Sequence, residues 1–236
     1  MLTLYYHPLS PISRRVWIAL LEKAIPFEPV VVNLTGEQLK PEFLALNPFH
    51  HVPVVVDGSL RILESLAILD YLEARYPATA LMPQNPAAIA QVRMVQMVTV
   101  NELTTKLPAL VLASDTSTPD KSPDEIPDKT PDKTLNDPVS QQVSTILSFL
   151  NEQLGELAFF GGEGLSLADI TVGTALPLMQ RLGVKWLEYA AIAAWFERVV
   201  SRSSWQQTEL NDVAFATWKR WVLLMIKQRQ RQMART

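Results

Sequence analysis

The chain has 236 residues, of which 48% are apolar and 19% charged, so it can bury a sizeable core and is long enough for two domains. Its formal net charge of -3 gives no positive field that would attract nucleic acid, and the absence of cysteine excludes disulfides, thiolate metal sites and a cysteine nucleophile. Any thiol chemistry must therefore use a thiol that the protein binds. The N-terminus lacks a signal-peptide pattern, and no stretch reaches about 18 uninterrupted apolar residues, so we expect a cytoplasmic protein without an integral membrane segment.

The first part of the chain predicts a β-α-β unit. Residues 2–6 are apolar and aromatic, which is typical of a strand, and two prolines break the pattern directly after it. Residues 16–23 have the composition of a helix, with Ser10 and Ser13 as candidate caps. Residues 27–32 predict a second strand, which we place near an edge of the sheet because it contains a proline.

A β-β-α unit is predicted to follow. Residues 40–46 indicate a short helix, and residues 52–58 indicate a strand that ends in an Asp-Gly turn. Residues 61–63 are its hairpin partner, and a helix with a leucine-rich face starts at Glu64. We therefore expect an α/β domain with the order βαβ-ββα over residues 1–80.

Beyond Pro86 the pattern predicts an all-α domain over residues 87–236. A capping box, Ser166 with Asp169, opens one of its helices. The four expected helices cover 89–112, 139–154, 167–182 and 187–200.

Two segments of this helical half stand apart. Residues 114–138 repeat Pro-Asp-Lys and cannot bury apolar surface, so we predict a solvated, flexible insert there.

From residue 214 onward the tail is basic and contains no acid, and its two tryptophans can share one face of a helix. Two interpretations stay open, a helix folded over a substrate pocket or a helix for a membrane surface or partner, and we expect fraying beyond Lys227.

Two helix starts carry candidate chemistry. Ser10 lies between a strand and a helix, where a hydroxyl can donate to an anion that the helix N-terminus also stabilises, or can simply cap the helix. Glu64 and Ser65 open a later helix, and the same physics applies there, with or without a ligand. At both helix starts, the residues alone do not distinguish helix capping from ligand binding.

Four motifs in this order resemble the glutathione transferase superfamily, and in particular a serine-type, phi- or theta-like member of bacterial type. They are Tyr5-Tyr6-His7-Pro8-Leu9-Ser10-Pro11-Ile12-Ser13-Arg14-Arg15-Val16, Asn47-Pro48-Phe49-His50-His51-Val52-Pro53, Glu64-Ser65-Leu66-Ala67-Ile68-Leu69-Asp70-Tyr71-Leu72 and Ser166-Leu167-Ala168-Asp169-Ile170. The resemblance implies a thioredoxin-like N-terminal domain and an all-α C-terminal helical bundle, with glutathione as cosubstrate.

The resemblance implies Ser10 as the catalytic residue, the hydroxyl donor to the glutathione thiolate. Ser13 and the tyrosines at 5 and 6 compete for this role, although a strand sends neighbouring tyrosines to opposite faces. Arg14 is either an electrostatic support for the thiolate or a solvated helix residue.

It also implies a set of glutathione-binding residues. Val52 would pair through its backbone with the cysteinyl part of glutathione, next to a cis Pro53, while Glu64 and Ser65 would hold the γ-glutamyl group. His51 would face the glycyl carboxylate, with Gln38 and Lys40 near the same group. We expect no metal site at the adjacent histidines 50 and 51, because neighbours in an extended segment point apart and no third ligand is in view.

The function that follows is a glutathione transferase acting on electrophilic, largely apolar small molecules, with peroxidase activity as a second reaction. The helical half would supply the second substrate's pocket, with Met94, Met97 and Val98 as candidates. Alternatives are a glutathione-dependent isomerase or disulfide reductase, and a non-catalytic ligand-binding or protein-interaction member of the fold. A homodimer is the family expectation.

Overall fold

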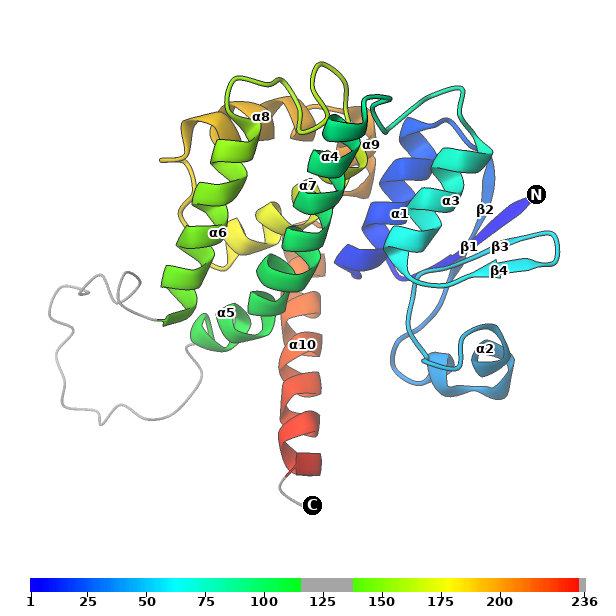
Figure 1. Cartoon of the computed structure of the whole chain (residues 1–236). Coiled ribbons are helices and arrows are strands. Elements are labelled where there is room, and N and C mark those ends of the chain that lie inside the picture. Colours follow the sequence, from blue (N-terminus) through cyan, green and yellow to red (C-terminus); the bar gives the residue numbers. More distant parts are fainter. Residues whose placement is uncertain (116–137, 234–236) are drawn as a thin grey trace, which may run out of the picture.

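The computed structural model describes residues 1–115 and 138–233 (Figure 1). Its N-terminal half runs β1 (Leu2–Tyr6), α1 (Pro11–Glu22), β2 (Phe27–Val31), η1 (Glu37–Leu39), α2 (Pro41–Leu46), β3 (Val54–Asp57), β4 (Leu60–Ile62) and α3 (Ser65–Arg75). The four strands form one sheet in the order β2-β1-β3-β4, with β1 and β2 parallel and the other pairs antiparallel. The predicted βαβ-ββα order is confirmed, and β2, which contains Pro29, lies at an edge.

The sheet has two covered faces because its side chains alternate. Leu2, Leu4 and Tyr6 of β1 belong to the main core, on the side where α1 and α3 lie. Tyr5 and Val54 face the other way and pack with Phe43 of α2. The two tyrosines at 5 and 6 therefore point to opposite faces, as the strand pattern predicted.

The helical half contains α4 (Pro86–Val98), η2 (Thr99–Leu103), η3 (Thr104–Lys106), α5 (Leu107–Ala113), α6 (Pro138–Leu154), α7 (Leu167–Arg181), α8 (Ala190–Val200), α9 (Ser203–Thr208) and α10 (Asp212–Met233). The prediction of one helix over 89–112 is wrong. After Val98 the chain passes through a π-helical turn and a 3-10 turn before α5 begins. Pro108 explains the break, because it lacks an N–H and its ring clashes with the carbonyl four residues earlier.

The tail is a long helix that does not fray at Lys227, contrary to the sequence prediction, since α10 continues to Met233. Trp218 is 2% exposed and anchors its first half in the core, where α10 packs against α5. The second half extends beyond the other helices (Figure 1). The predicted insert at 114–138 lies, apart from its ends, outside the described residues.

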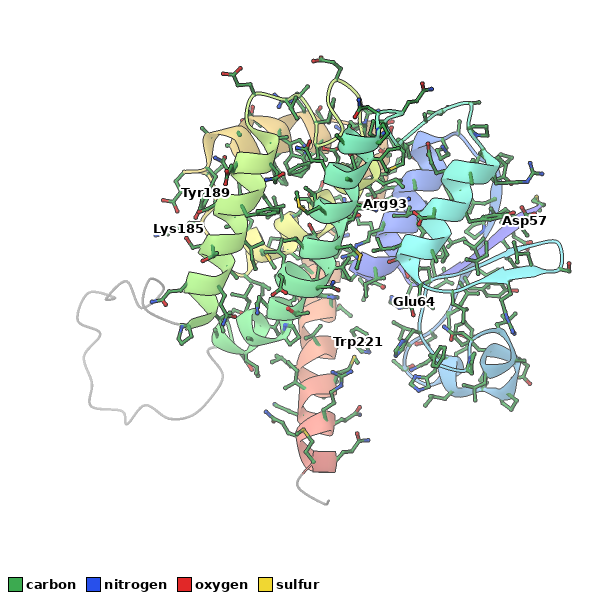
Figure 2. The ribbon with its side chains drawn as sticks, viewed as in Figure 1. Asp57, Glu64, Arg93, Lys185, Tyr189 and Trp221 are labelled. Carbon is green, nitrogen blue, oxygen red and sulfur yellow. The ribbon has the colours of Figure 1, made fainter. Side chains whose placement is uncertain are left out.

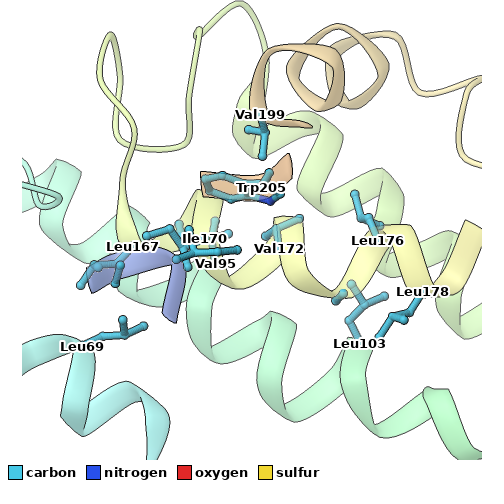
Figure 3. Close-up of a cluster of buried hydrophobic side chains, with 14 of the residues drawn as sticks. Leu69, Val95, Leu103, Leu167, Ile170, Val172, Leu176, Leu178, Val199 and Trp205 are labelled. Carbon is cyan, nitrogen blue, oxygen red and sulfur yellow. The ribbon is translucent and has the colours of Figure 1, made fainter. Parts of the chain in front are cut away.

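One hydrophobic core joins the two halves. Leu69 of α3 and Leu167 of α7 belong to the same cluster (Figure 3), and α1 packs against both α3 and α7. Polar ties reinforce this contact. Arg15 of α1 is 2% exposed and its Nε donates to the Thr174 hydroxyl of α7 at 3.4 Å.

Candidate functional site

The strand registers bring four segments to one end of the sheet, the end where β1 and β2 finish. We call this end the sheet edge. β1 and β3 are antiparallel with Tyr5 opposite Val54, so the end of β1 adjoins the start of β3. β4 pairs antiparallel with β3, and β2 runs parallel to β1, so both of them also end at that edge. The segments that leave the sheet there contain every site residue that the sequence predicted. They are Ser10, Gln38, Lys40, His51, Val52, Pro53, Glu64 and Ser65.

Ser10 is the N-cap residue of α1 and is 7% exposed. Its hydroxyl oxygen accepts a hydrogen bond from the backbone N–H of Ser13 at 3.2 Å. That bond uses a lone pair of the oxygen, so the hydroxyl proton stays available for a further acceptor. The positive end of α1 favours an anion at the same point. Capping and anion binding are therefore compatible roles for one hydroxyl.

The competing hydroxyls differ from Ser10 in their surroundings. Ser13 is fully buried, and its hydroxyl has no partner among the residues that the structure describes. Tyr6 is buried in the core, where its ring meets Trp17 edge to face with centroids 5.1 Å apart, and burial raises the pKa of its hydroxyl. Tyr5 is half-buried on the opposite face of the sheet.

Arg14 is not the solvated helix residue that was one of its two interpretations. It is 6% exposed, and its guanidinium donates to the Thr208 hydroxyl at 3.0 Å and to the Trp205 carbonyl at 3.2 Å. Burial lowers the pKa of Arg14 to about 10, against the opposing charge of Glu209. Arg14 thus stays charged near neutral pH while it ties α1 to α9.

The loop before β3 is shaped by Asn47, which the sequence analysis missed. Its side-chain amide donates to the His51 carbonyl at 2.7 Å, and its side-chain oxygen accepts from the Phe49 N–H at 2.9 Å. The Val52–Pro53 bond is cis, as the resemblance implied. Val52 lies outside the strand ladder, and its backbone forms no hydrogen bond with the described residues. Its N–H and C=O are therefore unpaired and could pair with an extended peptide ligand. The Asn-Pro pair after a short helix was the only sequence signal for the loop.

The N-terminus of α3 is left without a side-chain cap. Glu64 occupies the N-cap position with a φ of 64°, and its side chain makes no capping hydrogen bond. Ser65 follows as the first helical residue and is 6% exposed. By contrast, Ser10 and Asn85 cap α1 and α4. The first-turn N–H groups of α3 thus remain available for an anion.

Backbone strain marks the same edge. Within residues 1–115 and 138–233, the non-glycine residues with positive φ are Ala24, His50 and Glu64. Two of these three lie beside Val52 and Ser65, and each such conformation costs on the order of 1–3 kcal/mol. Strain of this kind concentrates at ligand sites, which supports this edge as the functional one.

The surroundings of His51 shift the pKa of its imidazole. Its ring lies nearly perpendicular to that of His50, with centroids 5.2 Å apart. Partial burial lowers the pKa of His51, the charges of His50 and Arg229 lower it further, and Glu64 opposes them. Glu64 and Arg229 of α10 thus both contribute to the electrostatic surroundings of His51. Sequence reasoning did not include Arg229 in these surroundings, because it lies far from His51 along the chain.

Gln38 and Lys40 have different surroundings. The Gln38 side chain holds its own loop, donating to the Leu34 carbonyl at 2.8 Å and accepting from the Gly36 N–H at 3.0 Å. Its amide nitrogen keeps a second N–H that these two bonds do not use. Lys40 is the exposed N-cap residue of α2 and forms no ion pair within the described part of the chain.

The helical half presents apolar side chains to solvent on two helices. Met94 and Met97 of α4 are 41% and 47% exposed, whereas Val98 is half-buried. On α10, Trp221 points toward the N-terminal half, on the side where Glu64 begins α3 (Figure 2). These groups can meet an apolar compound placed beside the sheet edge.

Other features do not compete with this site. A pocket of about 750 Å³ borders Arg14, Pro177 and Trp205, and it contains none of the predicted site residues. In the described chain, no group of three or more His, Asp or Glu side chains is placed to hold a metal ion. No described helix has the length and hydropathy needed to cross a bilayer.

Comparisons with known proteins agree with the geometry. The profile of the glutathione S-transferase N-terminal domain matches residues 4–80, and that of the C-terminal domain matches residues 101–203. Glutathione S-transferase F10 of Arabidopsis thaliana is 28% identical over 214 residues, which cover 86% of this chain and 94% of the plant protein. Maleylacetoacetate isomerase of Mus musculus is 43% identical over 95 residues, which cover 39% of this chain and 44% of the mouse protein. A delta-class glutathione transferase of Nilaparvata lugens superposes with a TM-score of 0.76 at 24% identity, over 95% of this chain and 100% of that one.

Proposed function

Since this chain belongs to the glutathione transferase superfamily, with profiles of both family domains matching it, we propose that the sheet edge binds glutathione and that Ser10 activates its thiol. The observation that supports the proposal is the state of the Ser10 hydroxyl. It is nearly buried and accepts a hydrogen bond from the Ser13 N–H, yet its own proton is free to be donated. It lies at the same end of the sheet as the unpaired Val52 backbone and the uncapped N-terminus of α3.

Glutathione fits this edge in one direction. Its γ-glutamyl carboxylate meets the first turn of α3 at Ser65, and its ammonium meets Glu64. Its cysteinyl part pairs with the Val52 backbone, which directs the thiol toward Ser10. The glycyl carboxylate then extends toward His51 and Lys40. Gln38 lies near the same group, and the second N–H of its side-chain amide can donate to that carboxylate.

The chemistry is thiolate transfer. A free thiol has a pKa of about 8.5, and a hydrogen bond from Ser10 together with the α1 N-terminus stabilises the thiolate at lower pH. The thiolate sulfur attacks an electrophilic carbon, a carbon–sulfur bond forms, and the leaving group departs with the electron pair of its broken bond. The same thiolate would reduce organic hydroperoxides as a second activity.

The wider setting follows from the family. We expect residues 1–80 to form the glutathione domain and residues 87–236 the substrate domain, which takes an apolar electrophile. We expect a cytoplasmic homodimer with a role in detoxification, paired through the β3–β4 hairpin and α4. The side chain of Leu60 in β4 is 47% exposed, which supports that pairing.

An isomerase is the second candidate. It is favoured by the 43% identity to the mouse maleylacetoacetate isomerase over 95 residues. That match covers less than half of either chain, so it does not identify the second substrate. Turnover of a cis-unsaturated diacid without net consumption of glutathione would identify this activity. Conjugation consumes glutathione stoichiometrically.

Variants of Ser10 separate its two roles. Ser10→Ala removes both the cap and the donor, Ser10→Asp keeps a cap acceptor but cannot donate, and Ser10→Thr keeps both. We expect the Thr variant to retain turnover and the Ala and Asp variants to lose it, with the pKa of bound glutathione returning toward about 8.5. Calorimetry and a chloro-nitrobenzene conjugation assay from about pH 6 to pH 9 measure this.

Asn85→Ala is the matched control, because it removes the N-cap of α4 and leaves the sheet edge unchanged. It should cost about 1 kcal/mol of stability, as Ser10→Ala should, without altering the thiol pKa. Undiminished turnover in Ser10→Ala would refute the thiolate role. A wild type that does not bind glutathione would refute the proposed function.

A further inference from the structure

The charges of the chain are divided unevenly between its last helix and everything before it. All 24 acidic residues precede residue 214, together with 15 of the 21 basic residues. The other six basic residues follow residue 213 with no acid among them, so the formal charge is -9 before residue 214 and +6 from there to the end. Such a separation concentrates a positive field on one part of the surface, which attracts an anionic partner to that part.

One face of α10 gathers three of these cations around a leucine. Its members are Arg220, Leu224, Lys227 and Arg231. Successive members are four, three and four residues apart, so they fall within about 60° around the helix axis. All four are exposed, and the three cations form no ion pair with any residue that the structure describes. We call these four residues the outward stripe, because Trp218, which is 2% exposed, projects from the opposite side of the helix.

The packing of α10 holds this stripe away from the rest of the molecule. On the inward side, the Phe215 and Trp218 rings stack with centroids 5.6 Å apart, and the Arg181 guanidinium of α7 lies 4.1 Å from the Phe215 centroid. Lys219 donates to the Ser114 carbonyl at the end of α5, at 2.7 Å. These contacts fix the rotation of α10 about its axis, and its second half extends beyond the other helices (Figure 1). The outward stripe is therefore accessible along its length.

Exposed apolar side chains accompany the cations. Leu224 is 54% exposed, and Val213, seven residues before Arg220 and on the same side of the helix, is 76% exposed. Apolar side chains gain free energy at the boundary between headgroups and acyl chains of a bilayer. The stems of Lys and Arg can lie along that boundary while their charges stay with the lipid phosphates. Several cations on a helix with such apolar positions are typical of binding to anionic phospholipids.

The stripe suits a protein partner less well. A helix that binds in a protein groove presents apolar anchors at positions i, i+3 or i+4, and i+7. Leu224 is the single apolar member of the outward stripe, and the positions three and seven residues after it are Lys227 and Arg231. Two copies of α10 packed by this face would set like charges against each other, which is unfavourable. A flat anionic surface, by contrast, can pair with cations at every position.

We propose that the outward stripe of α10 binds the protein reversibly to anionic phospholipid surfaces. Arg220, Lys227 and Arg231 pair with the lipid headgroups, and Leu224 enters the boundary below them. Because exposed charges are screened over about 10 Å at 0.1 M salt, this binding weakens as the salt concentration rises. The inference does not depend on the proposed function, since no member of the stripe belongs to the sheet edge.

Sedimentation of the intact protein with phospholipid vesicles tests this proposal. Vesicles of phosphatidylcholine alone are compared with vesicles of equal parts phosphatidylcholine and phosphatidylserine. Lys227→Gln and Leu224→Gln alter the stripe. Their matched controls are Lys185→Gln and Leu187→Gln, in the loop between α7 and α8, where both side chains are exposed and Lys185 lies near α6 (Figure 2). Thermal melting should be the same for all four variants, because each replaces an exposed side chain.

We expect wild type to sediment with the mixed vesicles and not with phosphatidylcholine alone, and added salt should release it. Lys227→Gln should weaken the partition roughly 5-fold, the loss expected for one cation at an anionic surface. Leu224→Gln should weaken it several-fold, and both controls should match wild type. Equal sedimentation with both kinds of vesicle, or equal losses in stripe and control variants, would overturn the proposal. Absence of vesicle binding would also overturn it, and oligomers larger than a dimer that Lys227→Gln abolishes would then assign the stripe to a second copy of the chain.

Discussion

Replacing Asp169 with alanine should destabilise the protein by about 4 kcal/mol, because its carboxylate collects buried donors. The residue is fully buried and accepts from the Phe160 N–H at 3.0 Å, the Ser166 N–H at 2.7 Å, the Ser166 hydroxyl at 2.6 Å and the Trp195 indole at 2.7 Å. The hydroxyl can rotate to another acceptor, whereas the other three donors are fixed. Each of the three donors that loses its acceptor costs about 1–3 kcal/mol, which gives a range of about 3–9 kcal/mol. Local relaxation should keep the loss near the lower end of that range, at about 4 kcal/mol.

A loss of that size is a large part of the stability of a folded protein, about 5–15 kcal/mol, so a second variant is needed in case Asp169→Ala does not fold. Asp169→Asn keeps one acceptor oxygen for Phe160 and Trp195 and should lose about 2 kcal/mol. Urea unfolding followed by far-UV circular dichroism measures both. The control is Asp70→Ala, whose carboxylate is 49% exposed and pairs with Arg93, so its loss should stay below about 1 kcal/mol. Equal midpoints for Asp169→Ala and Asp70→Ala would refute the reasoning.

Two further substitutions test contacts between helices. Burial alone would raise the pKa of Glu22, but hydrogen bonds and the charge of Arg202 lower it below 4.5, so this carboxylate stabilises the fold at neutral pH and its contribution is lost as pH falls through the folded-state pKa. Glu22→Gln should therefore be about 1 kcal/mol less stable than wild type at pH 7, and the difference in urea midpoints should shrink below pH 4.5; a constant difference would contradict this. Gly173→Ala should cost about 1–3 kcal/mol, because a Cβ there would lie 3.1 Å from the Trp205 indole nitrogen, whereas Gly164→Ala meets no atom within 4 Å and should be neutral by thermal melting.

Features of the fold that depend on residues close together in the sequence were predicted correctly. The Ser166–Asp169 capping box and the strand alternation at Tyr5 and Tyr6 depend on neighbours within a few residues, and both are confirmed. The break between α4 and α5 was visible in principle, since Pro108 cannot continue a helix, but the π-helical turn before it has no simple sequence signature. Six-residue α9 was missed because it is too short to show a helical period.

Long-range placement was the harder part of the site. The motifs around Ser10 and Glu64 were assigned through a family resemblance, and the strand registers show that both follow strands that finish at the same end of the sheet. The burial of Arg14 against Thr208 and Trp205 depends on how distant segments pack. No periodicity within one sequence contains that information.

The continuous core limits how such proteins can be recombined. A module can be exchanged between relatives when its boundary is polar, but here Arg15 of α1 bonds to Thr174 of α7, and Leu69 and Leu167 share one cluster. A hybrid that joins residues 1–80 to the helical half of another member inherits only one side of each of these contacts. Substitutions on α1 and α7 must therefore change together, and a graft without them should yield insoluble chains even if both parents are stable.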